Sequence, residues 1–291
     1  MIVLGGTNSK ELAKKTAYKL KAKYGSLIID RFPDGELYLR LPFKVSRQKV
    51  ILIESMHPNP DLSLIETIFA ARTCKELGAK EVILVAPYLA YLRQDKRFHP
   101  RECWSNRIMA ALLTCADKIL VIDPHLQRIS KLNSIFPIPA RKISANTVLA
   151  DYIKKNIKNP IILGPDWESF QWAEKIAEKI HVESTVLRKK RYTSRSVRIK
   201  LKGKVSNLKG RNVVIIDDII SSGHTMIEVI KQAKKMKAKT ITCLGVHGVF
   251  AENAYEKMKK AGATRIITTN TIQNKASKMD VSSVIADNLK R

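Results

Sequence analysis

Short apolar segments alternate with amphipathic helical patterns along the whole chain, and this alternation constrains the fold more than any other feature. Each apolar segment has the length of a strand, and the stretches between them repeat apolar residues at helical spacing. Strands that alternate with helices form parallel sheets, so the sequence predicts an α/β protein. The expected strands are Ile2–Leu4, Val50–Ile53, Val82–Val85, Ile119–Ile122, Ile161–Leu163, Val213–Ile216 and Ile241–Val246, and the expected helices lie near Lys10–Tyr24, Leu62–Leu77, Ser105–Cys115, Glu168–Ile180 and Thr225–Met236.

Two long segments of the chain resemble each other in the order of their features. Residues 49–91 and residues 212–252 both run from an apolar strand with an acidic end, through a loop and a helix, to an Ala-Lys turn and a second strand. Unrelated βαβ units also converge on this order. We favour an ancient duplication, in which Glu54-Ser55 of the first copy stands where Asp217-Asp218 stands in the second. The fold is therefore expected twice, and the acid pair in the second copy alone.

The length of 291 residues suits two domains of ordinary size. We place them at residues 1–145 and 146–291 and expect each to be a mainly parallel sheet flanked by helices. The Lys- and Asn-rich stretch 152–160 marks the neighbourhood of the boundary. A C-terminal helix near Ser282–Leu289 is expected to pack back on the first domain.

The chain is strongly basic, with 53 Lys and Arg against 26 Asp and Glu and a formal net charge of +27. Such a surface binds nucleic acids by releasing counterions, or it attracts anionic substrates into a cleft. Much of the lysine falls on the expected solvent faces of helices, and no nucleic-acid motif stands out, so nucleic-acid binding is not favoured as the main role. No apolar run reaches the length of a membrane span, and the four scattered cysteines suit a reducing compartment, so a cytoplasmic protein is expected.

The segment 213–226, VVIIDDIISSGHTM, combines two adjacent acids with a run of small and hydroxyl residues that leads into a helix. Free backbone N–H groups and hydroxyls at a helix start bind phosphate. Carboxylates at the carboxyl end of a parallel strand accept hydrogen bonds from sugar hydroxyls or reach a metal through water. The alternative is an ordinary helix cap, which needs only one acid or hydroxyl. Two acids, three hydroxyls and a glycine favour a functional site.

Three further segments have both a structural and a functional interpretation. Residues 31–40, RFPDGELYLR, contain a Pro-Asp-Gly turn signal between alternating strands, which predicts a hairpin. Residues 91–102, YLRQDKRFHPRE, put four Lys and Arg side chains in one loop after a strand. This pattern fits either a charged, solvent-exposed surface or a loop that binds a triphosphate. Residues 188–203, RKKRYTSRSVRIKLKG, contain no acid and are compatible with a solvated loop, an RNA-binding arm or a lid that closes on phosphates.

Six motifs follow one another along the chain: RFPDGELYLRL, YLRQDKR, VIDPHLQRI, LGPDWESFQWA, VLRKKRYTSRSVRI and VVIIDDIISSGHT. In this order they resemble the ribose-phosphate diphosphokinase family, archaeal-like, whose members consist of two type I phosphoribosyltransferase-like domains. The resemblance implies Mg²⁺-dependent transfer of the diphosphoryl group of ATP to the C1 hydroxyl of ribose 5-phosphate, giving 5-phosphoribosyl 1-diphosphate and AMP. It also implies a homo-oligomer, a dimer or larger, whose ATP site is shared between subunits, with no membrane partner.

The resemblance assigns roles to individual residues. It implies that ATP binds Phe32, Asp34, Glu36, Arg93, Gln94, Asp95 and His99. It implies that Lys189 and Arg191 are catalytic, with Lys190 as the alternative register for the lysine, and that His125 and Asp166 bind Mg²⁺. Ribose 5-phosphate is implied to bind Asp217, Asp218, Ser221, Ser222, Gly223, His224 and Thr225.

Three sites depart from the family pattern. In LGPDWESFQWA, which resembles the diphosphate loop of the family, Glu168-Ser169 replaces the usual glycine pair. In VVIIDDIISSGHT, which resembles its ribose 5-phosphate loop, Ser221 replaces a third acid and His224 replaces a small residue. The alternative functions are a nucleobase phosphoribosyltransferase and a non-catalytic regulatory homologue. The first would not need the segments of Phe32 and Arg93, and the second would be expected to lose Lys189 or the acid pair.

Overall fold

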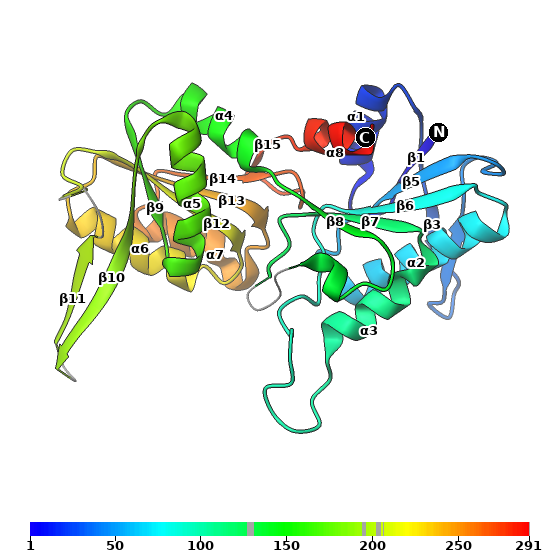
Figure 1. The fold of residues 1–291 in the computed structure, drawn as a ribbon, viewed down its shortest axis with the longest axis horizontal. Helices are drawn as coiled ribbons and strands as arrows, with labels where there is room; N and C mark the ends of the chain where they lie inside the picture. The colour runs from blue at the N-terminus through cyan, green and yellow to red at the C-terminus, as the bar shows by residue number, and fades with distance from the viewer. Residues whose placement is uncertain (127–130, 194–195, 202–204, 206, 291) are drawn as a thin grey trace. The chain divides into compact units, whose positions relative to one another are not determined.

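The structure is a computed structural model that describes residues 1–126, 131–193, 196–201, 205 and 207–290. The chain divides into two compact units (Figure 1). Unit 1 comprises residues 1–144, 270–273 and 280–291, and unit 2 comprises residues 145–269 and 274–279. Each unit is built on a mainly parallel sheet flanked by helices, so the predicted fold class is confirmed. In the described part of the chain, no helix is both long and apolar enough to cross a membrane.

Unit 1 begins with β1 (Ile2–Gly5), α1 (Lys10–Leu20) and β2 (Lys23–Ser26), continues with β3 (Ile28–Arg31), β4 (Leu37–Arg40), β5 (Lys49–Ile53), α2 (Pro60–Glu76), β6 (Glu81–Ala86), α3 (Ser105–Leu112), β7 (Lys118–Ile122) and β8 (Ala140–Ile143), and ends with α8 (Ser282–Leu289). Its parallel sheet has the order β2-β1-β5-β6-β7-β8. The strands β3 and β4 form a separate antiparallel hairpin. The last helix, α8, packs against α1, the first helix of the chain.

Unit 2 contains α4 (Asn146–Asn156), β9 (Pro160–Gly164), α5 (Trp167–Ile180), β10 (Glu183–Thr193), β11 (Ser196–Leu201), β12 (Asn212–Ile220), α6 (His224–Lys235), β13 (Thr240–Gly248), α7 (Ala254–Ala261), β14 (Arg265–Thr269) and β15 (Ser277–Met279). The strand order is β11-β10-β9-β12-β13-β14-β15. All neighbouring pairs in this order are parallel except β10 and β11, which form an antiparallel hairpin.

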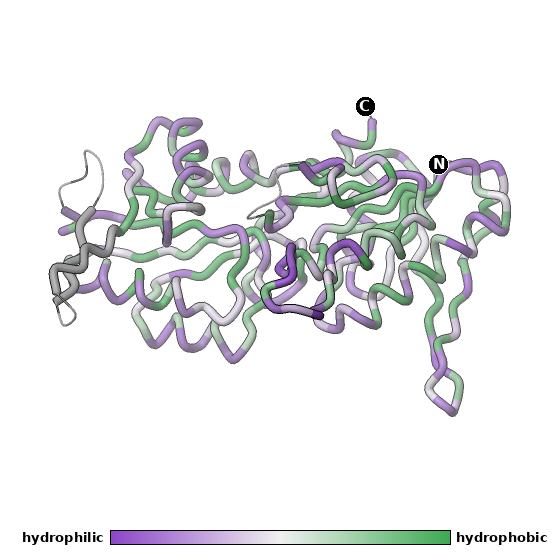
Figure 2. Tube along the Cα trace, turned by 60° about the horizontal axis from the view of Figure 1, so that its bottom comes forward, coloured by the Kyte–Doolittle hydropathy of each residue, from purple (hydrophilic) through white to green (hydrophobic). Residues whose placement is uncertain are grey.

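The direction of each crossover determines which face of a sheet its helix covers. In unit 2 the chain moves from β9 to β10 in one direction and from β12 to β13 in the other. Right-handed crossovers then place α5 and α6 on opposite faces. Accordingly α5 packs with α4 and α6 packs with α7, and Figure 2 shows the sheet of this unit between the two helical layers. Covered on both faces, the central strands are almost entirely apolar, as in the fully buried run Val213–Ile216 of β12.

The two similar segments of the sequence fold as the same unit. Residues 49–86 form β5, α2 and β6, and residues 212–248 form β12, α6 and β13, with the two strands parallel in each case. The expected repetition of the βαβ fold is therefore confirmed.

The Lys- and Asn-rich stretch 152–160, expected in the neighbourhood of the boundary, lies inside unit 2 rather than between the two units. The chain passes from unit 1 to unit 2 after Ser144, and the stretch lies inside unit 2, at the end of α4 and the start of β9. Lys154 and Lys155 lie on the solvent side of α4, whose buried side is Leu149, Ala150 and Ile153, and Lys158 lies in the exposed turn before β9. A polar helix face and a linker have similar compositions, which is why the sequence alone did not separate them.

Candidate active site

The acid pair lies near the carboxyl end of β12, the central strand of unit 2. Because β12 continues to Ile220 whereas its neighbour β9 ends at Gly164, Asp217 lies beside the turn that leads into α5. The Oδ1 atom of Asp217 accepts hydrogen bonds from Ser169 Oγ at 2.9 Å and from the Asp218 backbone N–H at 3.0 Å. Ligands of open α/β sheets bind at this edge, so the acids occupy the position that a binding role requires.

The pKa of Asp217 lies well above its ordinary value. Burial is the main cause, and the negative charge of Asp218 is the next; the hydrogen bond from Ser169 opposes them, and the charge of Asp166 adds to the rise. Two partly buried carboxylates side by side destabilise the fold when no ligand is bound. Such strain is typical of sites in which a ligand or an ion supplies the missing partner.

The segment between β12 and α6 forms a tight turn at the start of a helix. Gly223 has φ of 72°, and a Cβ atom there would lie 3.1 Å from Ala254 Cβ, so both the backbone and the packing favour glycine. Gly223 is also the N-cap residue, and within the described part of the chain the start of α6 has no side-chain cap hydrogen bond. The alternative interpretation of this segment as a simple side-chain cap is therefore wrong. The first N–H groups of α6 have no partner within the helix and point at the turn.

The hydroxyl and imidazole groups of this turn lie close together. Ser222 Oγ and His224 Nδ1 are 3.0 Å apart and share a hydrogen bond. Ser221 and Ser222 are partly buried, whereas His224 and Thr225 are exposed. The turn thus offers backbone donors, hydroxyls and an imidazole at one helix end, a combination suited to an anion.

Asp166 lies at the corresponding end of β9. It is the N-cap residue of α5, and its Oδ1 atom accepts a hydrogen bond from the Ser169 N–H at 2.8 Å. The turn is compact, because a Cβ atom at Gly164 would lie 2.6 Å from Phe170 Cα. Asp166, Ser169 and Asp217 therefore form one connected group in unit 2. His125, the other predicted metal ligand, follows β7 in unit 1.

The basic segment, for which the sequence left a solvated loop, an RNA-binding arm or a lid open, contributes to the antiparallel strands β10 and β11. Lys189 lies in β10 opposite Ile199 of β11, and Arg191 lies opposite Val197. For Lys189, Lys190 and Arg191 the structure describes the backbone alone, and residues 194–195 and 202–203 of the predicted lid lie outside the described residues. The strand β10 borders β9, whose carboxyl end leads to Asp166.

The predicted ATP residues all lie in unit 1. Phe32, Asp34 and Glu36 lie in the turn of the β3–β4 hairpin, which confirms the predicted hairpin. Phe32 is 49% exposed, and its ring meets that of Tyr38 edge to face, with ring centroids 5.8 Å apart. The other four follow β6 in the long segment before α3: Arg93 and His99 are exposed, Gln94 is partly buried and Asp95 is buried. The Glu102 carboxylate folds this segment by accepting hydrogen bonds from the backbone N–H groups of Phe98 and His99.

In the first copy of the repeat, Glu54 occupies the position of the acid pair but faces the interior. Glu54 is 1% exposed, and its carboxyl group accepts a hydrogen bond from Asn8 Nδ2 at 2.8 Å. Burial raises its pKa to about 8, partly opposed by the backbone N–H of Asn8 and reinforced by the charge of Glu66. The sequence correctly indicated that this copy lacks the acid pair. The hydrogen bond between Asn8 and Glu54 could not be predicted, because it joins residues 46 positions apart.

The raised pKa of Glu54 predicts a pH-dependent stability. The folded state holds the proton up to about pH 8, whereas the unfolded chain loses it near 4.5. The free energy of unfolding should therefore fall as pH rises between these values, by up to about 1.4 kcal/mol per pH unit. Replacing Glu54 with glutamine should remove this decline, as chemical denaturation at pH 5.5 and pH 8.5 would show. An equal decline in the variant would mean that other groups cause it.

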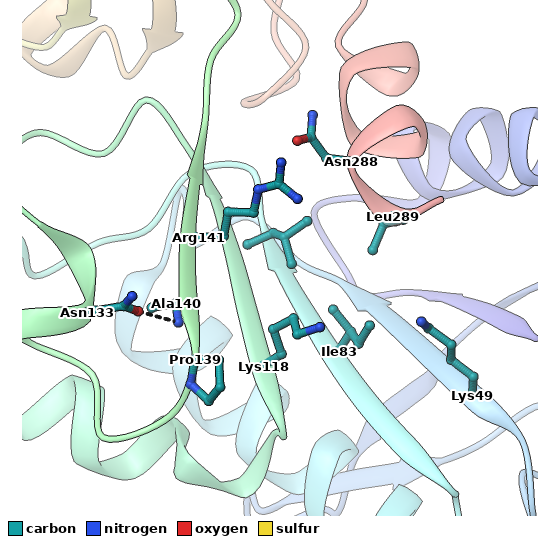
Figure 3. A pocket seen from close by; sticks show the side chains of 10 residues that line it. Lys49, Ile83, Lys118, Asn133, Pro139, Ala140, Arg141, Asn288 and Leu289 are labelled. Carbon is teal, nitrogen blue, oxygen red and sulfur yellow. Dashed lines mark hydrogen bonds between the residues drawn. The ribbon is translucent and has the colours of Figure 1, made fainter. Parts of the chain in front are cut away.

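A pocket of about 400 Å³ lies over one face of the unit 1 sheet, between strands β5–β8 and the end of α8 (Figure 3). It is lined by the side chains of Lys49, Lys118 and Arg141, at the starts of β5, β7 and β8, and by the end of α8. Glu81 pairs with Lys49 at 3.2 Å and with Lys118 at 4.0 Å, so part of the positive charge is neutralised. Because parallel sheets bind substrates at the carboxyl ends of their strands, this pocket is not the candidate active site.

The fold and the acid pair define a protein with two phosphoribosyltransferase-like domains. A family model for the N-terminal domain of ribose phosphate pyrophosphokinase matches residues 1–116, and a model for the phosphoribosyl transferase domain matches residues 131–283. The chain is 32% identical to the ribose-phosphate pyrophosphokinase of Sulfurisphaera tokodaii, over 98% of this chain and 99% of that one. It is 34% identical to the ribose-phosphate pyrophosphokinase of Methanosarcina acetivorans, over 100% of both chains.

A solved structure agrees with these sequence matches. The fold is similar to the crystal structure of phosphoribosylpyrophosphate synthetase from Mycobacterium smegmatis, with a TM-score of 0.84, 25% identity, and coverage of 99% of this chain and 97% of that chain. The chain therefore belongs to the ribose-phosphate pyrophosphokinase family, which is also called the ribose-phosphate diphosphokinase family. The predicted family and enzyme class are confirmed.

Proposed function

We propose that this chain transfers the diphosphoryl group of ATP to the C1 hydroxyl of ribose 5-phosphate, forming 5-phosphoribosyl 1-diphosphate and AMP. The observation that carries the proposal is the acid pair on β12 followed directly by the donor-rich turn at the start of α6. Family membership supports it, because the match covers the whole chain and so includes the segments proposed to bind ATP and those proposed to bind ribose 5-phosphate. The free thiols in the described chain suit the cytoplasm, where we place the enzyme.

Each part of the ribose site has a chemical task. Asp217 and Asp218 accept hydrogen bonds from the sugar diol, and the turn from Ser221 to Thr225 holds the 5-phosphate. The C1 hydroxyl oxygen then forms a bond to the β-phosphorus of ATP, while the bond from that phosphorus to the oxygen bridging the α-phosphate breaks. AMP leaves with the bridging oxygen, and the hydroxyl proton passes to solvent. Because the hydroxyl attacks directly, the protein contributes positioning and charge rather than a nucleophile.

The positive groups of the β10–β11 hairpin supply charge. We propose that Lys189 and Arg191 neutralise the negative charge that develops on the transferred group and on the departing AMP. The hairpin borders β9, whose end leads to Asp166, so it is attached next to the site that it would cover.

The carboxylates of unit 2 fit a divalent cation. The charges of Asp218 and Asp166 both raise the pKa of Asp217, so a cation nearby would relieve their repulsion. Within the described ranges, no three His, Cys, Asp or Glu side chains could hold a metal ion by themselves. Mg²⁺ suits such a site, because it binds one or two protein groups together with substrate phosphates. We propose that Asp166 and His125 hold Mg²⁺, which would neutralise phosphate charge when bound.

The ATP site would be completed by a neighbouring subunit. Phe32 at the tip of the β3–β4 hairpin is half exposed, as expected for a ring that stacks on an adenine carried by another chain. We propose a homo-oligomer in which Phe32, Asp34 and Glu36 reach the partner's nucleotide, while Arg93, Gln94, Asp95 and His99 bind ATP in unit 1.

Subunit complementation tests the shared site. Phe32→Ala and Lys189→Ala should each inactivate the enzyme, and mixing the two after reversible dissociation should restore about a quarter of the wild-type activity in a dimer. Half of the dimers would then be mixed, each with one intact site. Mixing Lys189→Ala with Asp218→Asn should restore nothing, because both changes affect the same subunit's part of the site. Mixed dimers of the first pair without activity would contradict the shared site.

The reaction itself is tested by following AMP. Wild-type protein with ATP, Mg²⁺ and ribose 5-phosphate should release AMP, and release should stop when ribose 5-phosphate is omitted. A nucleobase phosphoribosyltransferase would instead consume 5-phosphoribosyl 1-diphosphate and a free base without ATP. A regulatory homologue would show neither reaction. Either result would overturn the proposed function.

A further inference from the structure

Ser169 connects the acid pair to the turn that leads into α5, and it occupies a position where the family pattern has a glycine. Its hydroxyl donates a hydrogen bond to Asp217 Oδ1 at 2.9 Å, and its backbone N–H donates to Asp166 Oδ1 at 2.8 Å. One residue therefore contacts both the predicted ribose clamp and the predicted metal ligand. A glycine in this position could make the second contact but not the first.

The backbone of Ser169 is anchored at the start of α5. It lies in the first turn of α5, and Asp166 fixes its backbone as the helix cap. On either side, Trp167 and Phe170 stack with ring centroids 5.6 Å apart, and Phe170 is buried against Gly164. The Ser169 hydroxyl is therefore held at a defined place beside β12.

The bond from Ser169 also defines the orientation of the Asp217 carboxylate. Oδ1 accepts both from Ser169 Oγ and from the Asp218 N–H, so two donors on one oxygen oppose rotation of the group. The same bond favours the ionised carboxylate, against the effects of burial and of Asp218. An ionised and oriented carboxylate is the form that accepts a hydrogen bond from a sugar hydroxyl.

We propose that Ser169 is a positioning residue that holds Asp217 in the orientation needed to bind the ribose diol, and that in this chain it connects the ribose clamp to the start of α5. This inference rests on the proposed function, since it assigns Asp217 to ribose. Ser169 should therefore strengthen the binding of ribose 5-phosphate, and it should make no direct contact with ATP.

Steady-state kinetics of Ser169→Ala, Ser169→Gly and Ser169→Thr test the inference. Alanine and glycine should each raise KM for ribose 5-phosphate about tenfold or more, the effect expected for loss of one hydrogen bond to a charged group, with KM for ATP within about twofold of wild type. Threonine keeps the hydroxyl and should restore KM for ribose 5-phosphate. Ser277→Ala is the matched control, because Ser277 Oγ accepts a hydrogen bond from Asn274 N–H at 3.0 Å in the same unit, away from the acids; it should behave as wild type.

The outcomes separate this inference from the function on which it rests. Wild-type protein that transfers no diphosphoryl group would overturn the proposed function. Active wild type with an unchanged KM for ribose 5-phosphate in Ser169→Ala would overturn the role of Ser169 alone. An equal rise in KM for both substrates, not reversed by threonine, would show a general structural role and would also overturn it.

Discussion

Replacing Lys189 with alanine is expected to lower kcat by about 10³-fold while leaving the affinity for ribose 5-phosphate nearly unchanged. The reason is that its charge would act on phosphoryl oxygens as the bond to AMP breaks, whereas the ribose groups lie on β12 and α6. Removing a group that acts mainly in the transition state lowers kcat and kcat/KM together. Steady-state kinetics and calorimetric titration with ribose 5-phosphate would measure the two effects separately.

Lys190→Ala is the matched control, because it removes the same charge one residue further along β10. Near-normal turnover in Lys190→Ala together with collapse in Lys189→Ala would assign the catalytic role to Lys189. The reverse pattern would move the role to Lys190, which the sequence left open. Normal turnover in both variants would exclude the hairpin lysines from the chemistry.

Changing both acids of the pair to asparagine should reduce kcat/KM for ribose 5-phosphate by about 10²- to 10⁴-fold, because each lost hydrogen bond from a hydroxyl to a carboxylate costs about 1.5–3 kcal/mol. The same change should increase thermal stability, since burial and the charge of Asp218 both penalise an ionised Asp217 in the free protein. Loss of activity with gain of stability is the pattern of a site maintained for function.

Glu256→Gln provides the control for the acid pair. Glu256 is an exposed acid of α7 that pairs with Lys275 at the surface of the same unit. Its removal should change neither kcat/KM nor the melting temperature appreciably. A double Asp217→Asn, Asp218→Asn variant that melts lower than wild type and keeps its activity would contradict the assignment of the pair to ribose.

The features that the sequence predicted are those encoded by local patterns. The alternation of apolar strands with amphipathic helices determined the α/β class, and the apolar run ending in Asp217-Asp218 placed the pair at the carboxyl end of a parallel strand. Gly223 was predicted in a phosphate turn, and its positive φ agrees with that expectation. In each case a short stretch of chain carries its own signal, so no distant contact is needed to read it.

The features that the sequence missed depend on contacts between distant segments. The hydrogen bond from Ser169 to Asp217 joins residues 48 positions apart, and it exists because β12 extends past the end of β9. Asn8 fills the first copy of the site across 46 positions in the same way. The only sequence signal for Ser169 was its departure from the family glycine, which marked the position without indicating its partner.

The most direct test of the whole account is the fate of the β-phosphorus of ATP. The protein is incubated with Mg²⁺, ribose 5-phosphate and ATP labelled at the β-phosphorus, and the products are separated. We predict that the label appears in 5-phosphoribosyl 1-diphosphate, with one unlabelled AMP for each labelled sugar. Label that remains in ADP would show transfer of a single phosphoryl group and would contradict the proposed reaction.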